Sequence, residues 1–362
     1  MHAAPTEPMR VRGAGGADIQ TTRCGQPHGE GSHGAGSRYP VRGEPARLRF
    51  MRLLILGAGA VGGYFGGRLA EAGADVTFLV RPARKAQLES QGLRLTSPFG
   101  DVTLPVRARL ASEVDGDQDL VLLACKAYDL TAAMDAIAPA MSGRAGVLPF
   151  LNGVSHVATL EQRFGRGRVL GGTARIVASM TPDGVIQHLT KLSALAFGEL
   201  DGTVSPRTLA LLAACGRTSF ESRISTDIRR DLWLKLTFLG TLAAMNSLMR
   251  ASVGEIVRAP EGAALFARLF ETNAEICRRE GHAPDEAYLA NYRKLFAQTD
   301  STLEASLLRD LESGAPIEAD HLLGFLLERC RAHGLDDTLH ATTYAAAKAY
   351  EQRRAAGRIR ST

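Results

Sequence analysis

Three glycines near the start of the apolar part of the chain could bind the phosphates of a nucleotide. Gly57, Gly59 and Gly62 have the spacing G-x-G-x-x-G, between an apolar run and a stretch with helical periodicity. The first glycine of this motif allows a tight turn, the second lets the backbone approach a pyrophosphate, and the third lets helix pack on strand. The N–H groups at the helix start, including that of Ala60, would face the phosphates. We predict that these four residues bind a dinucleotide cofactor.

Arg81 indicates which dinucleotide this is. About 20 residues after the glycines, such domains usually carry an acidic residue that binds the adenosine ribose. This chain has Arg81 there, followed closely by Arg84 and Lys85, which could add positive charge. An arginine can pair with a 2′-phosphate, which a carboxylate would repel. The position favours NADPH over NADH, although a solvated basic turn would show the same residues.

Lys126 is a second candidate for cofactor binding. It follows the buried-strand run "DLVLLAC", and ligands collect at the carboxyl ends of strands in open α/β sheets. From there it could reach the adenine, ribose or phosphate of the cofactor. A surface lysine that begins the next helix is an equally good interpretation.

A parallel sheet is needed to bring these residues together. Apolar strands are predicted at 52–56, 75–80, 119–124 and 146–151, and helices at 64–72 and 130–138. This alternation predicts an α/β fold with a doubly wound, Rossmann-type sheet. Two further apolar or alternating stretches cover 93–97 and 102–108, and short strands cover 176–198.

The second half of the chain is predicted to be almost entirely helical. Helical patterns cover residues 230–247, 260–280, 285–296, 303–312, 321–333 and 338–354. We therefore expect an NADP-binding domain over 51–225, an all-helical substrate and catalytic domain over 226–354, and a tail over 355–362. Residues 1–50 contain nine glycines and five prolines and lack the apolar core of a secretory signal. They are interpreted as a disordered extension, or as sequence upstream of a true start at Met51.

Composition excludes several classes of function. The net charge is only +5 over 362 residues, and no basic stripe alternates with aromatic residues, which argues against nucleic acid as a partner. No apolar run approaches the roughly 20 residues that span a bilayer, so no membrane role is predicted. The five cysteines are scattered without a C-x-x-C pair, which is typical of reduced cytoplasmic thiols. No metal is expected, and His321 and His333 are predicted on helix surfaces.

Five separated segments together resemble the ketopantoate reductase (2-dehydropantoate 2-reductase) family. They are "MRLLILGAGAVGGYFGGRLAEAG", "LVLLACKAYD", "FLNGV", "RRDLWLKL" and "SLLRDLESGAPIEADHLLGF". The resemblance covers about residues 51–354. It implies NADPH-dependent reduction of 2-dehydropantoate to (R)-pantoate, a step toward pantothenate and coenzyme A. It also implies an active site between a Rossmann domain and a helical domain.

The resemblance assigns roles to individual residues. Lys235 is the expected catalytic lysine, and Glu318 the acidic partner of substrate and cofactor. Asn152 is expected near the nicotinamide and substrate, and Ser306 at the substrate carboxylate. Arg81 and Lys126 match the basic residues that favour NADPH.

The chemistry of 2-oxo acid reduction is compatible with these residue types. The carbonyl carbon takes a hydride and its oxygen a proton, which a positioned lysine can donate. The neighbours of Lys235 are Trp233, Leu234 and Leu236, so partial burial could lower its pKa. Taken singly, each site residue has a plainer interpretation: a solvated lysine, a helix-entry acid, a turn asparagine or a hydroxyl bonded to its own helix.

The sequence departs from the family pattern one and two helical turns after the lysine. Many members carry asparagines where this chain has Leu239 and Ala243. Asn246 is nearly on the same helix face, but it lies roughly 16 Å along the axis from Lys235 and cannot replace both. Apolar residues there could line a pocket for a less polar substrate, or a pocket that uses other hydrogen-bond donors.

Two alternatives to a ketopantoate reductase therefore stay open. One is a paralogue that reduces another branched or apolar 2-oxo acid. The other is a non-catalytic NADPH-sensing protein, although this would be expected to lose Lys235 or Glu318. The sequence does not determine the oligomeric state, so a homodimer stays open.

Overall fold

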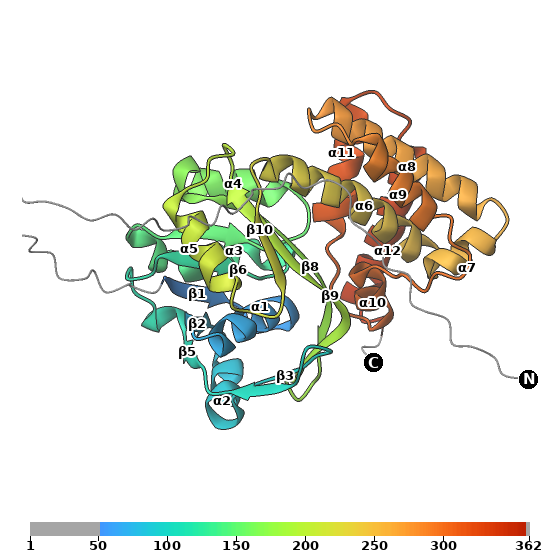
Figure 1. The fold of residues 1–362 in the computed structure, drawn as a ribbon. Coiled ribbons are helices and arrows are strands. Elements are labelled where there is room, and N and C mark those ends of the chain that lie inside the picture. The colour runs from blue at the N-terminus through green and yellow to red at the C-terminus, as the bar shows by residue number, and fades with distance from the viewer. Residues whose placement is uncertain (1–50, 360–362) are drawn as a thin grey trace, which may run out of the picture. The chain divides into compact units, whose positions relative to one another are not determined.

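The computed structural model describes residues 51–359, so the predictions for residues 1–50 lie outside the described residues. Five strands form a wholly parallel sheet in the order β5-β2-β1-β6-β7 (Figure 1). They are β1 Arg52–Leu56, β2 Asp75–Leu79, β5 Arg107–Arg109, β6 Leu120–Leu123 and β7 Gly146–Pro149. The strand order reverses between β1 and β6, and ligands bind at such a point in open α/β sheets. The predicted parallel α/β sheet is confirmed.

Helices and a second sheet bury both faces of this parallel sheet. Leu53 and Ile55 of β1 enter one apolar core together with helix α1 (Ala60–Glu71). Leu54 enters another core, with helices α3 (Leu130–Ile137) and α4 (Ser155–Phe164). Strands buried on both faces carry continuous apolar runs, which is why their sequences are so uniformly hydrophobic.

Glycines let α1 lie very close to the strands that it covers. A Cβ atom at Gly63 would collide with Ile186, one at Gly66 with Ile55 and Phe78, and one at Gly67 with Leu93. Helix α2 (Pro82–Gln91) lies further along the chain and contributes one buried side chain, Leu88.

The second sheet is mixed and lies beside α1. Its order is β10-β9-β3-β4, and β8 pairs antiparallel with β9. The strands are β3 Leu93–Thr96, β4 Val102–Leu104, β8 Leu170–Met180, β9 Ile186–Glu199 and β10 Glu221–Ile224. The stretch predicted at 102–108 is divided by Pro105 and Val106 into β4 and β5, which join different sheets.

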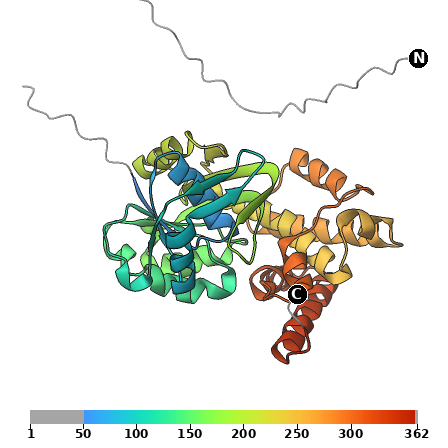
Figure 2. The ribbon, with the colours of Figure 1, turned by 90° about the horizontal axis from the view of Figure 1, so that it is seen from below.

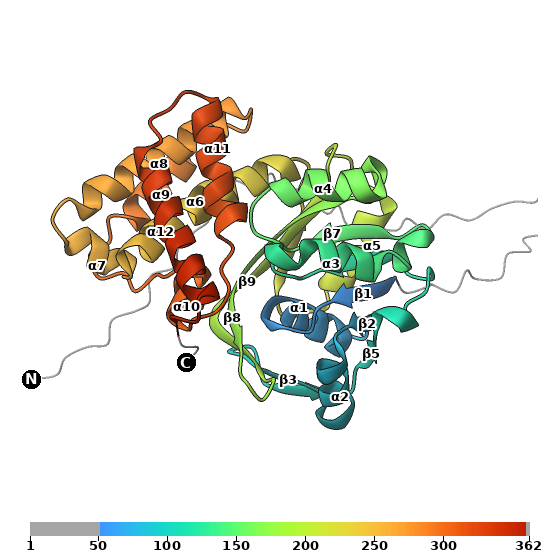
Figure 3. The same ribbon diagram turned by 180° about the vertical axis from the view of Figure 1, so that it is seen from behind.

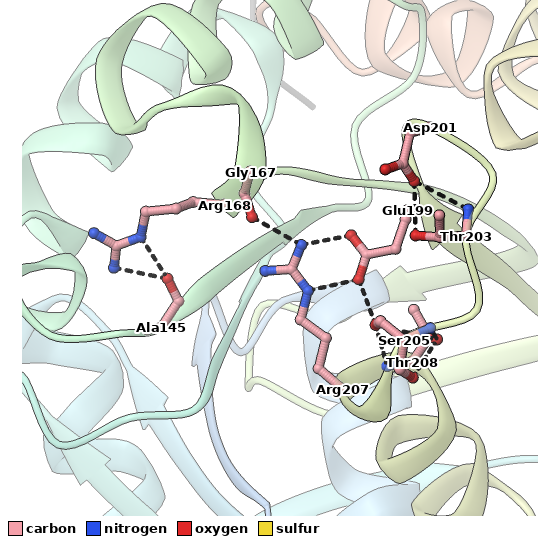
Figure 4. Close-up of polar contacts among 9 residues, drawn as sticks. All are labelled: Ala145, Gly167, Arg168, Glu199, Asp201, Thr203, Ser205, Arg207 and Thr208. Atoms are coloured by element: carbon pink, nitrogen blue, oxygen red, sulfur yellow. Dashed lines mark hydrogen bonds and ion pairs between the residues drawn. The ribbon is translucent and has the colours of Figure 1, made fainter.

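A polar cluster joins the end of β9 to helix α5 (Pro206–Cys215), as Figure 4 shows. Glu199 accepts hydrogen bonds from Arg207 Nε at 2.7 Å and Ser205 Oγ at 2.5 Å. Arg207 also donates to the Gly167 carbonyl at 3.1 Å. Arg168 donates to the Ala145 carbonyl at 2.7 Å, which ties the start of β8 to the start of β7. These charges are satisfied internally and therefore serve the fold.

The remaining chain is helical. Its helices are α6 Ile228–Met249, α7 Val253–Arg258, α8 Gly262–Arg279, α9 Glu286–Leu295, α10 Ser306–Glu312, α11 Phe325–Ala332 and α12 Thr338–Ala355. Helix α6 packs on β8 at one end and on α8, α10 and α12 along its length (Figures 1 and 3). Figure 2 shows the same helices gathered beside the sheets in a second view. The helical C-terminal domain is confirmed.

Helix α6 is the one helix within residues 51–359 that is long and apolar enough to cross a membrane. In this structure 67% of its apolar window is buried inside the protein. Such burial is what the central helix of a folded domain shows.

Candidate active site

The glycine turn has the backbone that a dinucleotide needs. Gly57 has a φ of +98°, and a Cβ atom at Gly62 would collide with the Gly57 carbonyl oxygen. A Cβ atom at Gly59 would meet nothing within 4 Å, so the surface above Gly59 is open. Helix α1 begins at Ala60 without a side-chain cap or an acidic residue in its first turn. Its first N–H groups have no intrahelical partner and fit a phosphate.

Arg81 lies directly after β2 and caps the start of α2. Its side chain is 81% exposed, and its one ion pair among residues 51–359 is to Asp129 Oδ2 at 3.2 Å. An exposed pair of this kind contributes little free energy, so the guanidinium is available to another anion.

The two basic residues after Arg81 are already bonded within the protein. Arg84 donates to the Ala58 carbonyl at 2.9 Å and to the Gly184 carbonyl at 3.0 Å. Lys85 donates to Glu113 at 2.7 Å. Arg84 therefore holds the glycine turn in place, and the contribution of either charge to cofactor binding stays a prediction.

Lys126 bridges the two halves of the structure. Its Nζ lies 2.6 Å from Asp310 Oδ2 and 3.9 Å from Glu318 Oε2. Burial alone would lower the pKa of Lys126, but the charges of Glu318 and Asp310 outweigh it and the pKa is raised. Lys126 is thus a half-buried cation at the carboxyl edge of the sheet and not a solvated surface lysine.

Glu318 is the centre of this arrangement. Its side chain is only 6% exposed, and Oε1 accepts a hydrogen bond from the Ala127 N–H at 2.7 Å. Its carboxylate therefore lies between the ammonium groups of Lys126 and Lys235. Its negative charge also favours the protonated form of Lys235. The two lysines come from opposite halves of the structure and share one counter-charge.

Lys235 has the environment that a proton donor requires. Its Nζ donates to the Ala174 carbonyl of β8 at 2.9 Å. Burial lowers the pKa of Lys235 to about 8; the Glu318 carboxylate opposes this shift and the Arg175 guanidinium reinforces it. The expectation that apolar surroundings would lower this pKa agrees with the structure.

Asn152 is held by its backbone. Its carbonyl accepts a hydrogen bond from His321 Nε2 at 2.7 Å, and His321 Nδ1 lies 3.1 Å from Ser155 Oγ. Among residues 51–359 no hydrogen bond is made by the Asn152 side chain, which is half-buried. The prediction that His321 lies on a helix surface was wrong. The turn Asp320–Gly324 is a π-helix, so its residues are offset from the register of an α-helix.

Ser306 is the first residue of α10. Asp310 lies one turn later on the same helix face and reaches Lys126, so the Ser306 face is directed toward the sheet. Asn246 is fully buried at the far end of α6, where it accepts from the Ala305 N–H at 2.9 Å and donates to the Ala251 carbonyl at 2.7 Å. It holds the start of α10 and does not replace the family asparagines.

The two apolar replacements differ from each other. Leu239 is partly exposed, one turn from Lys235. Ala243 is fully buried in the helical core, so the idea that it lines a pocket was wrong. The helix runs deeper into its own core after Gly240, which packs against Leu326.

Comparison with known proteins assigns the family. The model described as "Ketopantoate reductase PanE/ApbA" matches residues 53–202, and its C-terminal counterpart matches residues 227–351. An "Uncharacterized oxidoreductase YkpB" of Bacillus subtilis is 35% identical, over 83% of this chain and 99% of that protein. The chain belongs to the ketopantoate reductase family. It is an oxidoreductase of this family.

Other similar proteins include enzymes of two names. A 2-dehydropantoate 2-reductase of Mesorhizobium japonicum is 29% identical, over 77% of this chain and 91% of that protein. The crystal structure of a putative ketopantoate reductase from Ralstonia solanacearum is 30% identical with a TM-score of 0.74, covering 84% of this chain and 99% of that one. A D-mandelate dehydrogenase solved with NADH and anilino(oxo)acetate is 20% identical with a TM-score of 0.75, which shows the fold alone.

Within this ketopantoate reductase fold, the structure adds residues that sequence spacing did not find. Asp310 pairs with Lys126 across 184 positions, and His321 binds Asn152 across 169. His156 is 1% exposed, its ring lies 5.7 Å from that of His321, and neither of its nitrogens has a hydrogen-bond partner within the described part of the chain. No local pattern marks contacts between residues so far apart. In residues 51–359 no group of three or more possible metal ligands occurs, and the four described cysteines are free.

Proposed function

We propose that this protein uses NADPH to reduce a 2-oxo acid, and that the reaction is the conversion of 2-dehydropantoate to (R)-pantoate. The observation that carries the proposal is the position of Lys235. A half-buried ammonium from the helical domain is bonded to a strand of the α/β domain, and Glu318 lies between it and the carboxyl end of β6. A proton donor therefore meets the edge where such sheets bind nucleotides.

The proposed cofactor site consists of residues whose hydrogen-bonding groups are free, or whose present contacts a cofactor could replace. Its members are Gly57, Gly59, Ala60, Gly62, Arg81, Lys126, Asn152 and Glu318. The open surface over Gly59 and the uncapped start of α1 suit a pyrophosphate. Arg81 suits a 2′-phosphate, which is the reason for preferring NADPH. The bound nicotinamide would supply the hydride.

Lys235 is proposed to donate the proton to the carbonyl oxygen of the substrate. With a pKa of about 8 it is mostly protonated at neutral pH, yet it gives up its proton more readily than an ordinary lysine. Its positive charge also favours the negative charge that develops on that oxygen during hydride addition. Glu318 is proposed to keep Lys235 oriented and to accept a hydrogen bond from a substrate or ribose hydroxyl.

Two neutral side chains complete the proposed substrate site. The Asn152 amide is free to bind substrate or nicotinamide, because its backbone alone is bonded to His321. Ser306, on the α10 face that meets Lys126, is proposed to donate to the substrate carboxylate.

The test follows NADPH oxidation with 2-dehydropantoate, with pyruvate and 2-oxoisovalerate as competing substrates and NADH as the competing cofactor. Lys235→Ala should lower kcat/KM by about 10²- to 10⁴-fold, the usual contribution of a positioned acid. Lys191→Ala, which removes an exposed lysine from β9, should leave it unchanged. NADPH binding without turnover of any 2-oxo acid would refute the enzyme and favour the non-catalytic sensor.

A second substrate is favoured by Leu239. This partly exposed leucine, one turn from Lys235, offers no hydrogen bond to a substrate hydroxyl. The protein would then reduce another branched or apolar 2-oxo acid. In that case 2-oxoisovalerate should exceed 2-dehydropantoate in kcat/KM, and Leu239→Asn should shift the ratio back toward 2-dehydropantoate. A ratio that does not move with Leu239→Asn would count against this candidate.

A further inference from the structure

Arg175 is a charged residue of β8 that the proposed site does not yet use. It is exposed, although its neighbours Ala174 and Thr173 are buried. Within residues 51–359 no hydrogen bond or ion pair of its guanidinium is found, whereas most arginines in this part of the chain bind a carboxylate or carbonyl. An arginine of β8 without such a partner is therefore an exception among them.

The strand places Arg175 beside Lys235. Side chains alternate along a strand, so Gly171, Thr173 and Arg175 share one face of β8. A Cβ atom at Gly171 would touch Ile228 of α6, so this is the face that α6 covers. The residue before Arg175, Ala174, contributes the carbonyl that accepts a hydrogen bond from Lys235 Nζ.

Electrostatics agree with this placement. The charge of Arg175 opposes protonation of Lys235. Burial raises the pKa of the Tyr292 hydroxyl of α9, and the charge of Arg175 offsets part of that shift. Glu318 is bonded to Ala127 and lies by Lys126, so it does not neutralise Arg175 as well. Arg175 therefore adds a second positive charge beside Lys235 without a carboxylate partner in residues 51–359, which favours the binding of a further anion.

A 2-oxo acid supplies such an anion at the required position. Its carboxylate is attached directly to the carbonyl carbon, so a cation beside the proton donor meets it when the carbonyl oxygen reaches the donor. The planar guanidinium can bind both carboxylate oxygens at once, which fixes orientation as well as position.

We propose that Arg175 binds the carboxylate of the substrate and thereby holds the carbonyl oxygen against Lys235. This inference rests on the proposed function and extends it, because it makes the negative charge of the substrate a requirement of the site.

The experiment compares each preferred 2-oxo acid with its uncharged methyl ester, in wild type, Arg175→Met, Arg175→Lys and Arg166→Met. Arg166 lies in the turn before β8, is exposed, and controls for the loss of one charge. Arg175→Met should lower kcat/KM for the acid on the order of 10- to 100-fold, the usual worth of a charged hydrogen bond. The ester should be unaffected, Arg175→Lys should retain part of the acid preference, and Arg166→Met should match wild type.

A second readout does not depend on turnover. Oxamate, an unreactive 2-oxo acid analogue, should bind the NADPH-loaded wild type in calorimetry and bind Arg175→Met at least about 10-fold more weakly. NADPH affinity should be equal in both. An unchanged acid-to-ester ratio, equal oxamate binding, or no oxamate binding to wild type would overturn the role of Arg175. If no 2-oxo acid is reduced but oxamate binding depends on Arg175, the proposed reaction fails and the anion site stands.

Discussion

Replacing His156 by methionine should make the protein less sensitive to acid. His156 lies in α4 with 1% of its surface exposed, and both ring nitrogens lack a hydrogen-bond partner in the described part of the chain. Burial, reinforced by the nearby His321 and Lys235, lowers its pKa from 6.5 to about 3. Below pH 6.5 His156 is therefore protonated in the unfolded chain, whereas it stays neutral in the folded chain.

The size of the effect follows from the two pKa values. The pKa of His156 is lower in the folded state than in the unfolded state. Its contribution to stability is therefore fully present above pH 6.5 and is lost as the pH falls toward 3. Each pH unit in that window removes about 1.4 kcal/mol of the free energy of unfolding. Between pH 7 and pH 5 the loss from His156 alone is about 2 kcal/mol, against a total stability of about 5–15 kcal/mol.

The assay is urea unfolding at pH 7 and pH 5, followed by circular dichroism. Between pH 7 and pH 5 the free energy of unfolding of His156→Met should fall by about 2 kcal/mol less than that of wild type. At a slope of about 3 kcal/mol/M, this is a difference of about 0.7 M in the shift of the urea midpoint. Leu160→Met, one turn later in α4 and equally buried, disturbs packing without changing titration and should behave as wild type. An equal pH 5 loss in wild type and His156→Met would refute the reasoning.

Three further changes test the site. Because Lys235 must be protonated to donate, kcat/KM for reduction should fall as the pH rises above about 8, and a pH profile that stays flat there would exclude it as the acid. Gly62→Ala should lower both the Tm and the affinity for NADPH, because a Cβ atom has no room there. Gly59→Ala should leave the Tm unchanged and lower only the affinity for NADPH. Thermal melting and fluorescence titration with NADPH distinguish these two outcomes. Arg81→Asp should lower the preference for NADPH over NADH by roughly 10-fold or more, measured as the ratio of kcat/KM values, and an unchanged ratio would mean that Arg81 does not meet the 2′-phosphate.

The parallel sheet could be predicted because its strands are buried on both faces and therefore carry unbroken apolar runs. Helix α2 was missed although Pro82 begins it and Gly92 ends it, both ordinary helix signals. Only Leu88 of this helix is buried, so no apolar stripe marks it. Helix α5 likewise begins at a Ser-Pro pair that sequence reading could have used.

The candidate site was predictable only where a local motif exists. The glycine turn depends on residues that lie within five positions of one another, so spacing alone locates it. The contact between Glu318 and the Ala127 N–H joins residues 191 positions apart, and it depends on how the helical domain meets the sheet. The hydrogen bond from His321 to the Asn152 carbonyl depends on a π-helical turn, which no sequence pattern predicts.

The tight packing of α1 has a consequence for the order in which the chain acquires its structure. Glycine in a helix interior costs about 1 kcal/mol relative to alanine, and α1 has four, so this helix has little tendency to form alone. It becomes stable only against its strand partners, which include Ile186 of β9. A chain emerging from the ribosome is therefore expected to complete the glycine turn only after more than a hundred later residues have been synthesised, so a cofactor proposed to bind there would follow the folding of β9.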